Sequence, residues 1–597
     1  MTRRESRSRA ILSIALVSQL ALPGPLGATT LAPSQPPDDD ATTIHVLNRL
    51  TFGPSSADLE KVRRLGVSEW IDAQLRPGTS ADTALATRLA PLETLSMGAV
   101  ELREKYEIPP NIRQQIQKAR AERDASAGKE SAGAPGERYE QMDPKARREE
   151  REAMVRRFPQ LATLLGTPQK VVAELQAGKV LRAAFAERQL DEVMADFWFN
   201  HFNVFARKGP VEFMVGDYER TLRERSFGKF EDLLVAVAQS PAMLFYLDNW
   251  QSTDPNFSPR DLYRAQARTR MPANGNPRRR PSAMVPEMMG GGANNQAKQP
   301  PKRTFGINEN YARELMELHT LGVDGGYVQA DVVEVAKAFT GWTILGEGPG
   351  GPRRNKESRF AFAAPAHVKG DKRVLGVTIK DGGEKEGLEI LHLLATHPST
   401  ARFISSKLVR RFVADHPPEG LVDRAAATFA KTGGDIREVL RTILKSEEFL
   451  GPAYRAAKVK TPFEFVVSAV RASGAEVRNP QVLAQKISAM GMPLYLQQPP
   501  TGYKDAAEEW ISTTSLLERM NFALDLSAGR LRGVTLKGAG RSADNKAPTL
   551  DTVAAQILPA GLSPKSRETL EAEAQKDGND PAKLVGLVLG SPEFQRR

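Results

Sequence analysis

Cysteine is absent from this chain of 597 residues. The protein therefore has no disulfide bond, no thiol nucleophile, no thiolate ligand for a metal, and no cysteine to carry a lipid. Any catalytic or metal chemistry has to come from histidine, carboxylate, hydroxyl, lysine or arginine side chains.

Long apolar runs are also missing. After the first residues, no stretch approaches the roughly 18 apolar residues that a membrane-spanning helix needs, so no transmembrane anchor is expected. The chain lacks the motifs HExxH and GxSxG, a Walker loop, and a GxGxxG turn between a strand and a helix. No cofactor is therefore evident from a motif, and none of these motif-defined enzyme classes is indicated.

The first 28 residues have the pattern of an export signal. Four arginines, at positions 3, 4, 7 and 9, precede the apolar run from Ile11 to Leu22, and Ala28 offers a small residue for cleavage. We expect residues 1–28 to direct general secretion and residues 29–41 to form a disordered leader. The mature protein is then expected in the periplasm or outside the cell.

Positive charge is concentrated in one segment. The formal net charge is +11, and residues 252–305 alone hold ten basic residues against three acidic ones. Their proline, glycine and asparagine content without periodicity predicts a disordered basic insertion. This insertion would suit an anionic envelope surface, although a solubilising loop is the plainer interpretation. Since the rest of the mature chain is close to neutral, no nucleic-acid partner is expected.

Hydrophobic residues make up 40% of the chain and charged residues 26%, which is typical of a globular protein. Apolar residues recur with helical spacing through most of residues 42–530, the expected body, and again in a C-terminal segment at 550–597. Residues 120–157 are expected to form a charged arm and residues 531–549 a linker.

A β signal occurs at 359–362 and 373–379, and it predicts one two-stranded ribbon that has to pack on helices. The expected fold is mainly α, a multi-helix globular body with one small β-ribbon and disordered insertions.

A helical spacing pattern recurs three times. Apolar residues at offsets of 0, 3, 4 and 7 are followed by a serine at offset 10, starting at Phe230, Ile436 and Pro581. These offsets define one face of a helix, and the serine predicts a sharp exit into another element. We interpret the pattern as a reused structural unit without chemistry.

The stretch 308–322 combines polar chemistry with a well-defined helix. An asparagine at its start suits an N-cap, and a glycine at its end suits a left-handed C-cap. At about 100° per residue, Arg313, Glu314 and Glu317 share one face, and His319 lies among apolar residues on the other. A solvated face with an Arg313–Glu317 pair and a core histidine is the plain interpretation.

Two further helices carry candidate residues. His45 and Arg49 lie on the predicted helix that starts at Thr42. Asn200 and His201 end a predicted helix, with His201 on its apolar side. A single histidine on an apolar face is more often a hydrogen-bonded core residue than a ligand.

Several segments resemble the DUF1800 family of exported bacterial proteins, whose biochemical role is not settled. They are, in order, 45–49 with 52–53, 198–202, 243–249, 308–322, 339–342, 407–413 and 510–523. The resemblance implies a mainly helical fold, an envelope location, and a co-exported partner similar to a sulfatase or alkaline phosphatase. Similar proteins tend to have a His-Asp pair in the β-ribbon, whereas here Val368 follows His367, which argues against a reactive site there.

Convergence of the helices near residues 45, 200 and 314 would assemble a site for an envelope hydrolase or lyase. A glutamate would then act as general base, a histidine would titrate near neutral pH, and guanidinium groups would bind an anion. Alternatively, three histidines with a glutamate would hold a divalent metal ion. The candidates are His45, Arg49, Asn200, His201, Arg313, Glu314, Glu317 and His319. Glu314 and His319 point about 140° apart on a straight helix, so they cannot both be ligands.

The other hypothesis is a non-enzymatic scaffold or binding partner for a co-exported protein. The same polar residues would then form a buried network that fixes the packing without a substrate. A pocket open to solvent would favour the enzyme, and full burial with mutual hydrogen bonds would favour the scaffold.

Overall fold

The computed structural model describes residues 39–78, 81–108, 167–258, 306–345, 358–536, 549–576 and 580–597, with residue 578 and a few single positions between 109 and 166. The expected signal segment 1–28 and most of the leader 29–41 lie outside these residues. So do nearly all of the charged arm 120–157, most of the basic insertion 252–305 and most of the linker 531–549.

The described chain is mainly helical, as predicted. Its first part contains α2 (Asp40–Leu50), α3 (Ser56–Leu65), α4 (Val67–Leu75), α5 (Thr83–Leu89), η1 (Glu93–Ser96), α6 (Ala99–Tyr106), α10 (Thr167–Phe185), α11 (Gln189–His201), α12 (Val211–Arg225), α13 (Phe230–Ala238), α14 (Pro241–Tyr246), η3 (Asn249–Gln251), α16 (Glu309–Glu314), η4 (Leu315–Thr320) and α17 (Gln329–Ala338). The second part contains η5 (Ala364–Ala366), α18 (Glu384–Ala395), α19 (Pro398–Phe412), α20 (Glu419–Thr432), α21 (Ile436–Leu444), α22 (Glu447–Leu450), η6 (Pro452–Tyr454), α23 (Pro462–Ser473), α24 (Pro480–Ala489), η7 (Ala507–Glu509), α25 (Thr513–Ser527), α26 (Leu550–Ile557), α27 (Pro564–Gln575) and α28 (Pro581–Gly590). None of the described helices is both long enough and apolar enough to cross a bilayer.

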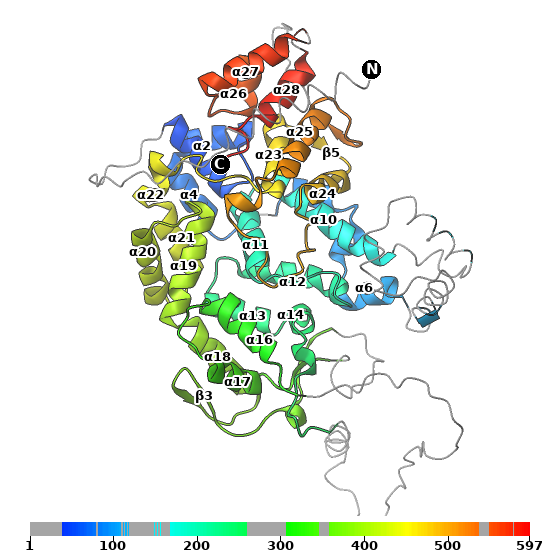
Figure 1. The fold of residues 1–597 in the computed structure, drawn as a ribbon, viewed down its shortest axis with the longest axis vertical. Helices are drawn as coiled ribbons and strands as arrows, with labels where there is room; N and C mark the ends of the chain where they lie inside the picture. The colour runs from blue at the N-terminus through cyan, green and yellow to red at the C-terminus, as the bar shows by residue number, and fades with distance from the viewer. Residues whose placement is uncertain are drawn as a thin grey trace, which may run out of the picture.

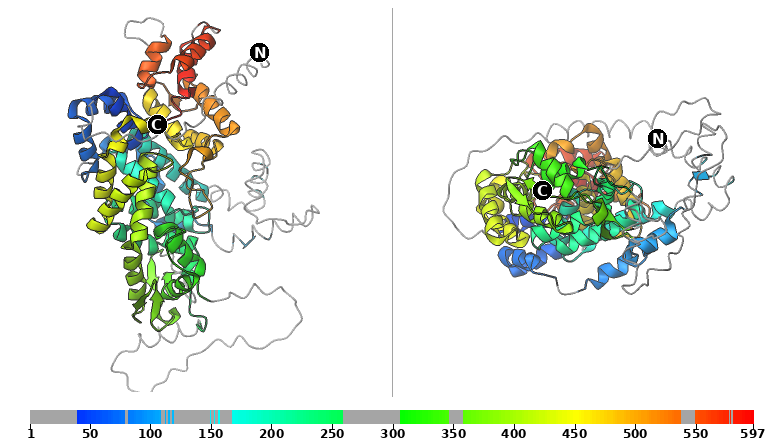
Figure 2. Two further views of the ribbon diagram at one scale, coloured as in Figure 1. Left: turned by 60° about the vertical axis from the view of Figure 1, so that its left-hand side comes forward. Right: turned by 90° about the horizontal axis from the view of Figure 1, so that it is seen from below.

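The helices build an elongated molecule (Figure 1). Helices α17 and α18 lie at one end, α11 to α16 fill the middle, and α26 to α28 form the other end. Helices α19 to α21 run along one side. The C-terminal residues return from the far end and lie beside α2, as Figure 1 and the left view of Figure 2 show.

The β structure differs from the predicted ribbon. Strand β2 (Phe360–Phe362) pairs antiparallel with β1 (Trp342–Ile344), and β3 (Lys372–Val374) pairs with β4 (Val377–Ile379). The predicted pairing of 359–362 with 373–379 is therefore wrong. Strands of three residues are too short to show a clear alternation, and β1 is buried along its whole length, so its sequence gave no strand signal.

Three expected boundaries also move. α2 begins at Asp40 instead of Thr42, because Asp39 caps it by accepting the Thr42 N–H at 2.6 Å. The fold extends into the expected insertion, since Thr253 is fully buried and donates its N–H to the Gly306 carbonyl at 3.0 Å. Within the expected linker 531–549, β6 (Val534–Thr535) pairs with β5 (Glu476–Val477).

The repeated spacing corresponds to a helix followed by a serine turn, as predicted. α13, α21 and α28 are these helices, and each is followed by a buried serine, namely Ser240, Ser446 and Ser591. The first two copies meet at their starts. The Phe230 N–H donates to the Gly434 carbonyl at 2.8 Å, and the Ile436 N–H donates to the Gly228 carbonyl at 3.1 Å. The unit therefore serves packing.

The hydrophobic core fixes the end of α11. Trp198 and Phe202 are fully buried and stack with their ring centroids 5.8 Å apart, and the indole N–H donates to the Ser226 carbonyl at 3.0 Å. Burial of an aromatic side chain contributes about 2–3 kcal/mol. Because these anchors flank Asn200 and His201, both candidate side chains are held in place from each side.

Candidate functional site

The helix that begins at Asn308 changes type midway. Asn308 caps it as predicted, because its Oδ1 accepts the Tyr311 N–H at 3.1 Å. α16 then passes into the π-helical segment η4, where the Leu321 N–H donates to the Met316 carbonyl at 2.7 Å. A π turn is wider than an α turn, so the predicted sharing of faces does not hold beyond Glu314.

His201 and His319 meet at this segment. The Nε2 atom of His201 donates to the backbone oxygen of His319 at 3.1 Å, and the ring centroids are 6.4 Å apart. Burial, and secondly the charge of Lys407, lowers the pKa of His319 to about 3 and holds the pKa of His201 well below its usual value. Both rings are therefore neutral at neutral pH, contrary to the expectation of a histidine that titrates there.

His45 and Arg49 lie elsewhere. His45 Nε2 donates to the Phe449 carbonyl at 2.8 Å, and burial lowers the pKa of His45 to about 3. Arg49 is fully buried and donates to the Tyr454 carbonyl at 2.8 Å. His45 and His201 line two different pockets. The structure therefore does not bring His45 to the site of His201 and His319, although α2 also packs against α11.

The charged residues of the Asn308 helix line neither of these two pockets. Arg313 donates to Gln329 Oε1 at 2.6 Å, and Glu317 accepts the Tyr327 hydroxyl at 3.1 Å. Glu314 is half-buried, and burial together with the charge of Glu317 raises its pKa. These three residues are therefore not assembled with His201 at one site.

A cavity of about 520 Å³ lies between α11, α19 and the loop that leads to α25; we call it the central pocket. Two of the sequence candidates, Asn200 and His201, line it. Its ionisable residues besides His201 are Asp196, Lys407, Arg410, Arg411, Asp415, His416, Lys504, Asp505 and Glu508. Three segments that carry the DUF1800 resemblance, 198–202, 407–413 and 510–523, contribute residues to this one pocket.

Lys407 and Arg410 present free hydrogen-bond donors at the central pocket. The Lys407 ammonium lies 5.3 Å from the Phe403 ring centroid, and within the described part of the chain it has no hydrogen bond or ion pair. Arg410 donates Nε to the Asp415 carbonyl at 3.2 Å, and its other two nitrogens have no partner among the described residues. Burial, and then the charge of Arg410, lowers the pKa of Lys407 to about 8. Both groups are thus mainly cationic at neutral pH.

A buried ion pair supports this wall from behind. Arg411 Nη1 lies 2.5 Å from Glu464 Oε1, and Arg597 Nη1 lies 3.2 Å from the same oxygen. Burial by itself raises the pKa of Glu464, but the charges of Arg411 and Arg597 outweigh it and lower the pKa to about 2. Glu464 also accepts the Thr461 N–H at 2.9 Å at the start of α23, so this cluster joins α19, α23 and the C-terminal residues.

The three aspartates of the pocket are already engaged, and Asp196 pairs with Lys179 at 2.6 Å. Lys458 forms ion pairs with Asp415 and, at 3.0 Å, with Asp505. Asp415 also accepts the Ala507 N–H at 2.8 Å. Neither Asp415 nor Asp505 forms an ion pair with Lys407, although the charge of Asp505 opposes the lowering of the Lys407 pKa by burial. Within the described residues, Lys407 and Arg410 therefore keep donors that no carboxylate occupies.

Asn200 holds the loop that closes the pocket. Its Nδ2 donates to the Tyr503 carbonyl and its Oδ1 accepts the Tyr503 N–H, both at 2.8 Å. Asn203 donates to two carbonyls of the same loop at 2.9 and 2.8 Å. Gly502 has φ +68°, and a Cβ atom there would come within 2.2 Å of the Asn200 backbone oxygen. Asn200 is therefore a positioning residue.

Among the residues that the structure describes, no three His, Asp or Glu side chains gather closely enough to hold a metal ion. The predicted ligand set of His45, His201 and His319 with a glutamate is not assembled, because His45 lines another pocket.

Lys407 and Arg410 were not singled out as candidates from the sequence, although segment 407–413 was part of the DUF1800 resemblance. Basic residues three positions apart on an amphipathic helix look like a solvated face. The loop that lines the pocket with Lys407 and Arg410 is distant from them in sequence. A local spacing pattern therefore cannot predict that contact.

The fold and this pocket define a mainly helical protein with an enclosed, charged cavity. The chain belongs to the DUF1800 family, described as a protein of unknown function, whose model matches residues 45–596. The match confirms the resemblance and includes α26 to α28. Neither a search of curated proteins nor a search of solved structures finds a match.

Proposed function

We propose that the protein binds an anionic group, a carboxylate, sulfate or phosphate, in the central pocket. The observation that carries the proposal is the pair of cations at Lys407 and Arg410, whose donors face a cavity instead of a protein carboxylate. The planar guanidinium of an arginine can donate two parallel hydrogen bonds to such an oxygen-rich group, and the ammonium of a lysine adds a compact positive charge.

The enclosure strengthens this interaction. Charge-assisted hydrogen bonds contribute about 1.5–3 kcal/mol each, and screening by salt is weaker for partly buried groups than for exposed ones. Lys407 without a ligand is destabilised by its burial, as its lowered pKa shows. A bound anion would offset that cost, so the free cation favours ligand binding.

Isothermal titration with sulfate, phosphate and a uronic acid tests the proposal. K407M and R410M should each lower the affinity for the most tightly bound of these anions by about 10-fold or more. K431M, which removes an exposed lysine that lines neither pocket, is the matched control and should leave the affinity unchanged. Equal affinities of wild type and the K407M/R410M double variant would refute the proposal.

The enzymatic alternative, an envelope hydrolase or lyase, is supported at this pocket by one observation. Lys407 has a pKa near 8, and a lysine with a lowered pKa acts as a general base close to neutral pH. K407R would then keep anion binding but lose turnover of an anionic polysaccharide. Tight binding by wild type without turnover of any tested polymer would leave binding as the function.

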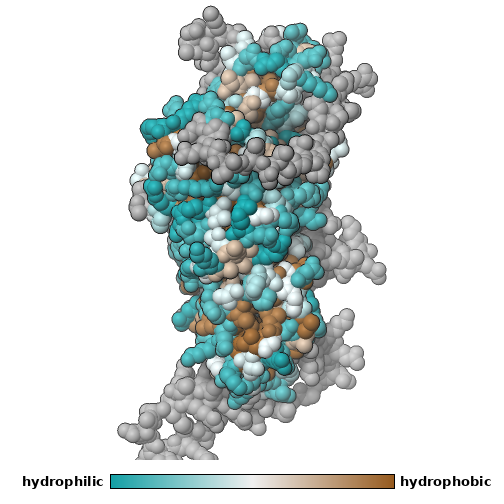
Figure 3. Space-filling view, turned by 90° about the vertical axis from the view of Figure 1, so that its left-hand side faces the viewer, coloured by the Kyte–Doolittle hydropathy of each residue, from teal (hydrophilic) through white to brown (hydrophobic). Residues whose placement is uncertain are grey.

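A role as binding partner of a co-exported protein is supported by an apolar surface. Val323, Val328 and Val377 are 68%, 62% and 43% exposed. The Asp331 carboxylate accepts the N–H groups of Val328 and Leu375 at 2.9 and 2.8 Å, which joins the start of α17 to the β3–β4 hairpin. Figure 3 shows an apolar patch toward the end of the molecule where α17 and α18 lie.

Co-purification with a co-exported protein similar to a sulfatase or alkaline phosphatase tests this second role. V328D/V377D should abolish association, whereas K407M should not. Association that persists in V328D/V377D would exclude this surface.

We infer that either function is exercised outside the cytoplasm, because residues 1–28 have an arginine-rich start, an apolar run and a small residue for cleavage. N-terminal sequencing of the protein from a periplasmic fraction should begin at Thr29. A chain that keeps Met1 and remains in the cytoplasm would contradict the inference.

A further inference from the structure

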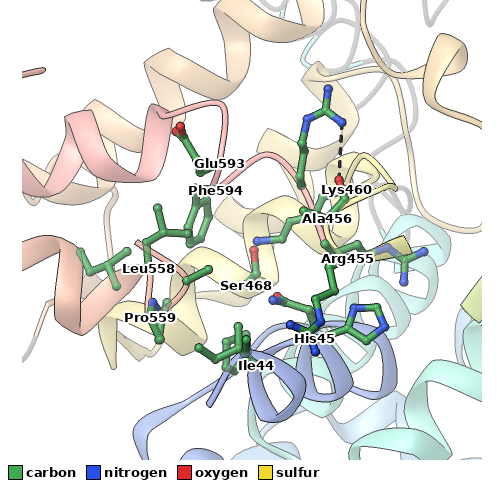
Figure 4. Close-up of a pocket in the computed structure, with 18 of the residues that line it drawn as sticks. Ile44, His45, Arg455, Ala456, Lys460, Ser468, Leu558, Pro559, Glu593 and Phe594 are labelled. Atoms are coloured by element: carbon green, nitrogen blue, oxygen red, sulfur yellow. Dashed lines mark hydrogen bonds between the residues drawn. The ribbon is translucent and has the colours of Figure 1, made fainter. Parts of the chain in front are cut away.

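A second cavity, of about 350 Å³, lies between α2, α23 and the C-terminal helices; we call it the upper pocket (Figure 4). Apolar side chains of Ile44, Leu558, Pro559 and Phe594 form much of its wall. Its volume falls in the range of small-molecule sites. The upper pocket shares no lining residue with the central pocket, so it does not belong to the site described above.

One cation points into this apolar space. Lys460 is 4% exposed, and its ammonium lies 3.9 Å from the centroid of the Phe594 ring. Figure 4 shows its side chain reaching toward Ser468 and Phe594. The backbone of Lys460 is fixed, because its N–H donates to the Gln595 carbonyl at 2.9 Å and its carbonyl accepts from Arg519 at 2.7 Å.

The Lys460 ammonium has no hydrogen-bond or ion-pair partner within the described residues. Burial lowers the pKa of Lys460 to about 7; the charge of Glu464 opposes this shift, and those of Arg597 and Arg519 add to it. A buried charge without a partner is destabilising, and cation–π contact with Phe594 recovers only about 0.5–2 kcal/mol.

The other charges around the pocket leave it positive. Its charged lining residues besides Lys460 are Asp40, Arg455, Glu593, Arg596 and Arg597. Both carboxylates are engaged, since Asp40 pairs with Arg63 at 2.9 Å and Glu593 accepts the Ser563 N–H at 3.2 Å. His45, whose pKa is about 3, adds no charge at neutral pH. The second oxygen of Glu593, Oε2, is buried without a hydrogen-bond partner, but within the described residues neither carboxylate forms an ion pair with Lys460.

We infer that the upper pocket binds a carboxylic acid with an apolar tail, whose carboxylate pairs with Lys460 and whose tail packs against Leu558, Pro559 and Phe594. This binding is independent of the anion site proposed in the central pocket. Because one wall comes from α26 and the turn after α28, the ligand joins the C-terminal helices to the body of the protein.

Octanoate is the probe, and octanol, which has the same tail without a carboxylate, is its control. Titrations in the K407M/R410M background prevent a contribution from the central pocket. Octanoate should bind and raise the Tm, whereas octanol should bind about 10-fold more weakly or not at all. The K460M substitution should lower the affinity for octanoate by about 10-fold or more.

K460M should fold without loss of stability, because it replaces an unpaired buried cation with an apolar side chain of similar length. Binding of octanoate at pH 8 should also take up a proton, since the carboxylate stabilises the charged form of Lys460. Two results would overturn the inference. The first is an octanoate affinity of the K407M/R410M/K460M variant that lies within twofold of the octanoate affinity of K407M/R410M. The second is that K407M/R410M binds octanoate and octanol with equal affinity.

Discussion

His201 donates its Nε2 proton to the backbone carbonyl of His319 at 3.1 Å, and this bond joins the end of α11 to the π-helical segment η4. The two rings are buried and neutral, so their contact is a structural joint beside the central pocket. The bond holds the His201 ring in the pocket wall. Its Nε2 proton is donated to the backbone and is therefore not available to a ligand in the pocket.

Removal of the His201 donor should destabilise the fold. H201L leaves the His319 carbonyl without a partner, which costs about 1–3 kcal/mol, whereas H201Q keeps an N–H donor and should lose less. Urea unfolding of the two variants measures the difference. Equal stability of H201L and wild type would show that the bond contributes nothing.

Gly502 should tolerate no side chain. G502A places a Cβ atom against the Asn200 backbone oxygen at a position with φ +68°, and it should displace the loop and remove anion binding. G491A is the matched control, because Gly491 also has a positive φ, +97°, but open space around it. We expect G502A to lose about 2 kcal/mol more stability than G491A. Similar losses in both variants would contradict the clash.

The buried pair of Arg411 and Glu464 should be far more sensitive than a surface pair. E464Q removes the carboxylate that forms ion pairs with both Arg411 and Arg597 and leaves only the more distant Asp505 charge near both, so it should cost about 3–5 kcal/mol. E448Q removes the partner of Arg424, which is half exposed, and should cost at most about 1 kcal/mol. Chemical unfolding measures the loss in the free energy of unfolding for E464Q and E448Q. Equal losses would mean that solvent screens the ion pairs of Glu464 as it screens a surface pair.

Acid should weaken the fold above the pH at which carboxylates with ordinary pKa values titrate. The pKa values of His45 and His319 are lowered from 6.5 to about 3, and that of His201 is also held well below 6.5, so below pH 6.5 the unfolded chain binds protons that the folded chain does not. Stability therefore falls as pH drops from about 6.5 toward 3, with up to about 1.4 kcal/mol per pH unit for each histidine.

The interval from pH 6.5 to 5 favours this effect, because the ordinary pKa of Glu464, 4.5, lies below it. The raised pKa of Glu314 acts in the opposite direction, since folded Glu314 binds its proton first, so E314Q is the background for the measurement. Urea midpoints across this interval measure the slope, which should be shallower in H201Q. A flat profile between pH 6.5 and 5 would show that these histidines are accessible to protons in the folded state.

Local signals in the sequence were sufficient for many elements. Asn308 caps its helix as predicted, and α13, α21 and α28 are each followed by the predicted serine. These features depend on neighbours within one or two turns, so a spacing pattern records them. The mainly helical class and the repeated unit followed from the same periodicity.

The site could not be obtained in the same way. The helical wheel of residues 308–322 assumed an α-helix, and the π segment η4 changed which residues share a face. The convergence of His45 with His201 was an assumption about long-range packing. Lys407 lines the central pocket together with the loop that Asn200 and Asn203 hold, which is a contact between distant segments.

The central claim is that an anion sits between Lys407 and Arg410. Crystals grown in selenate, an anomalously scattering analogue of sulfate, test it by placing the selenium directly. We predict a selenium peak within hydrogen-bonding distance of the Lys407 ammonium and the Arg410 guanidinium, absent from K407M/R410M crystals. Selenate bound only elsewhere, in crystals whose central pocket is open to solvent, would contradict the account.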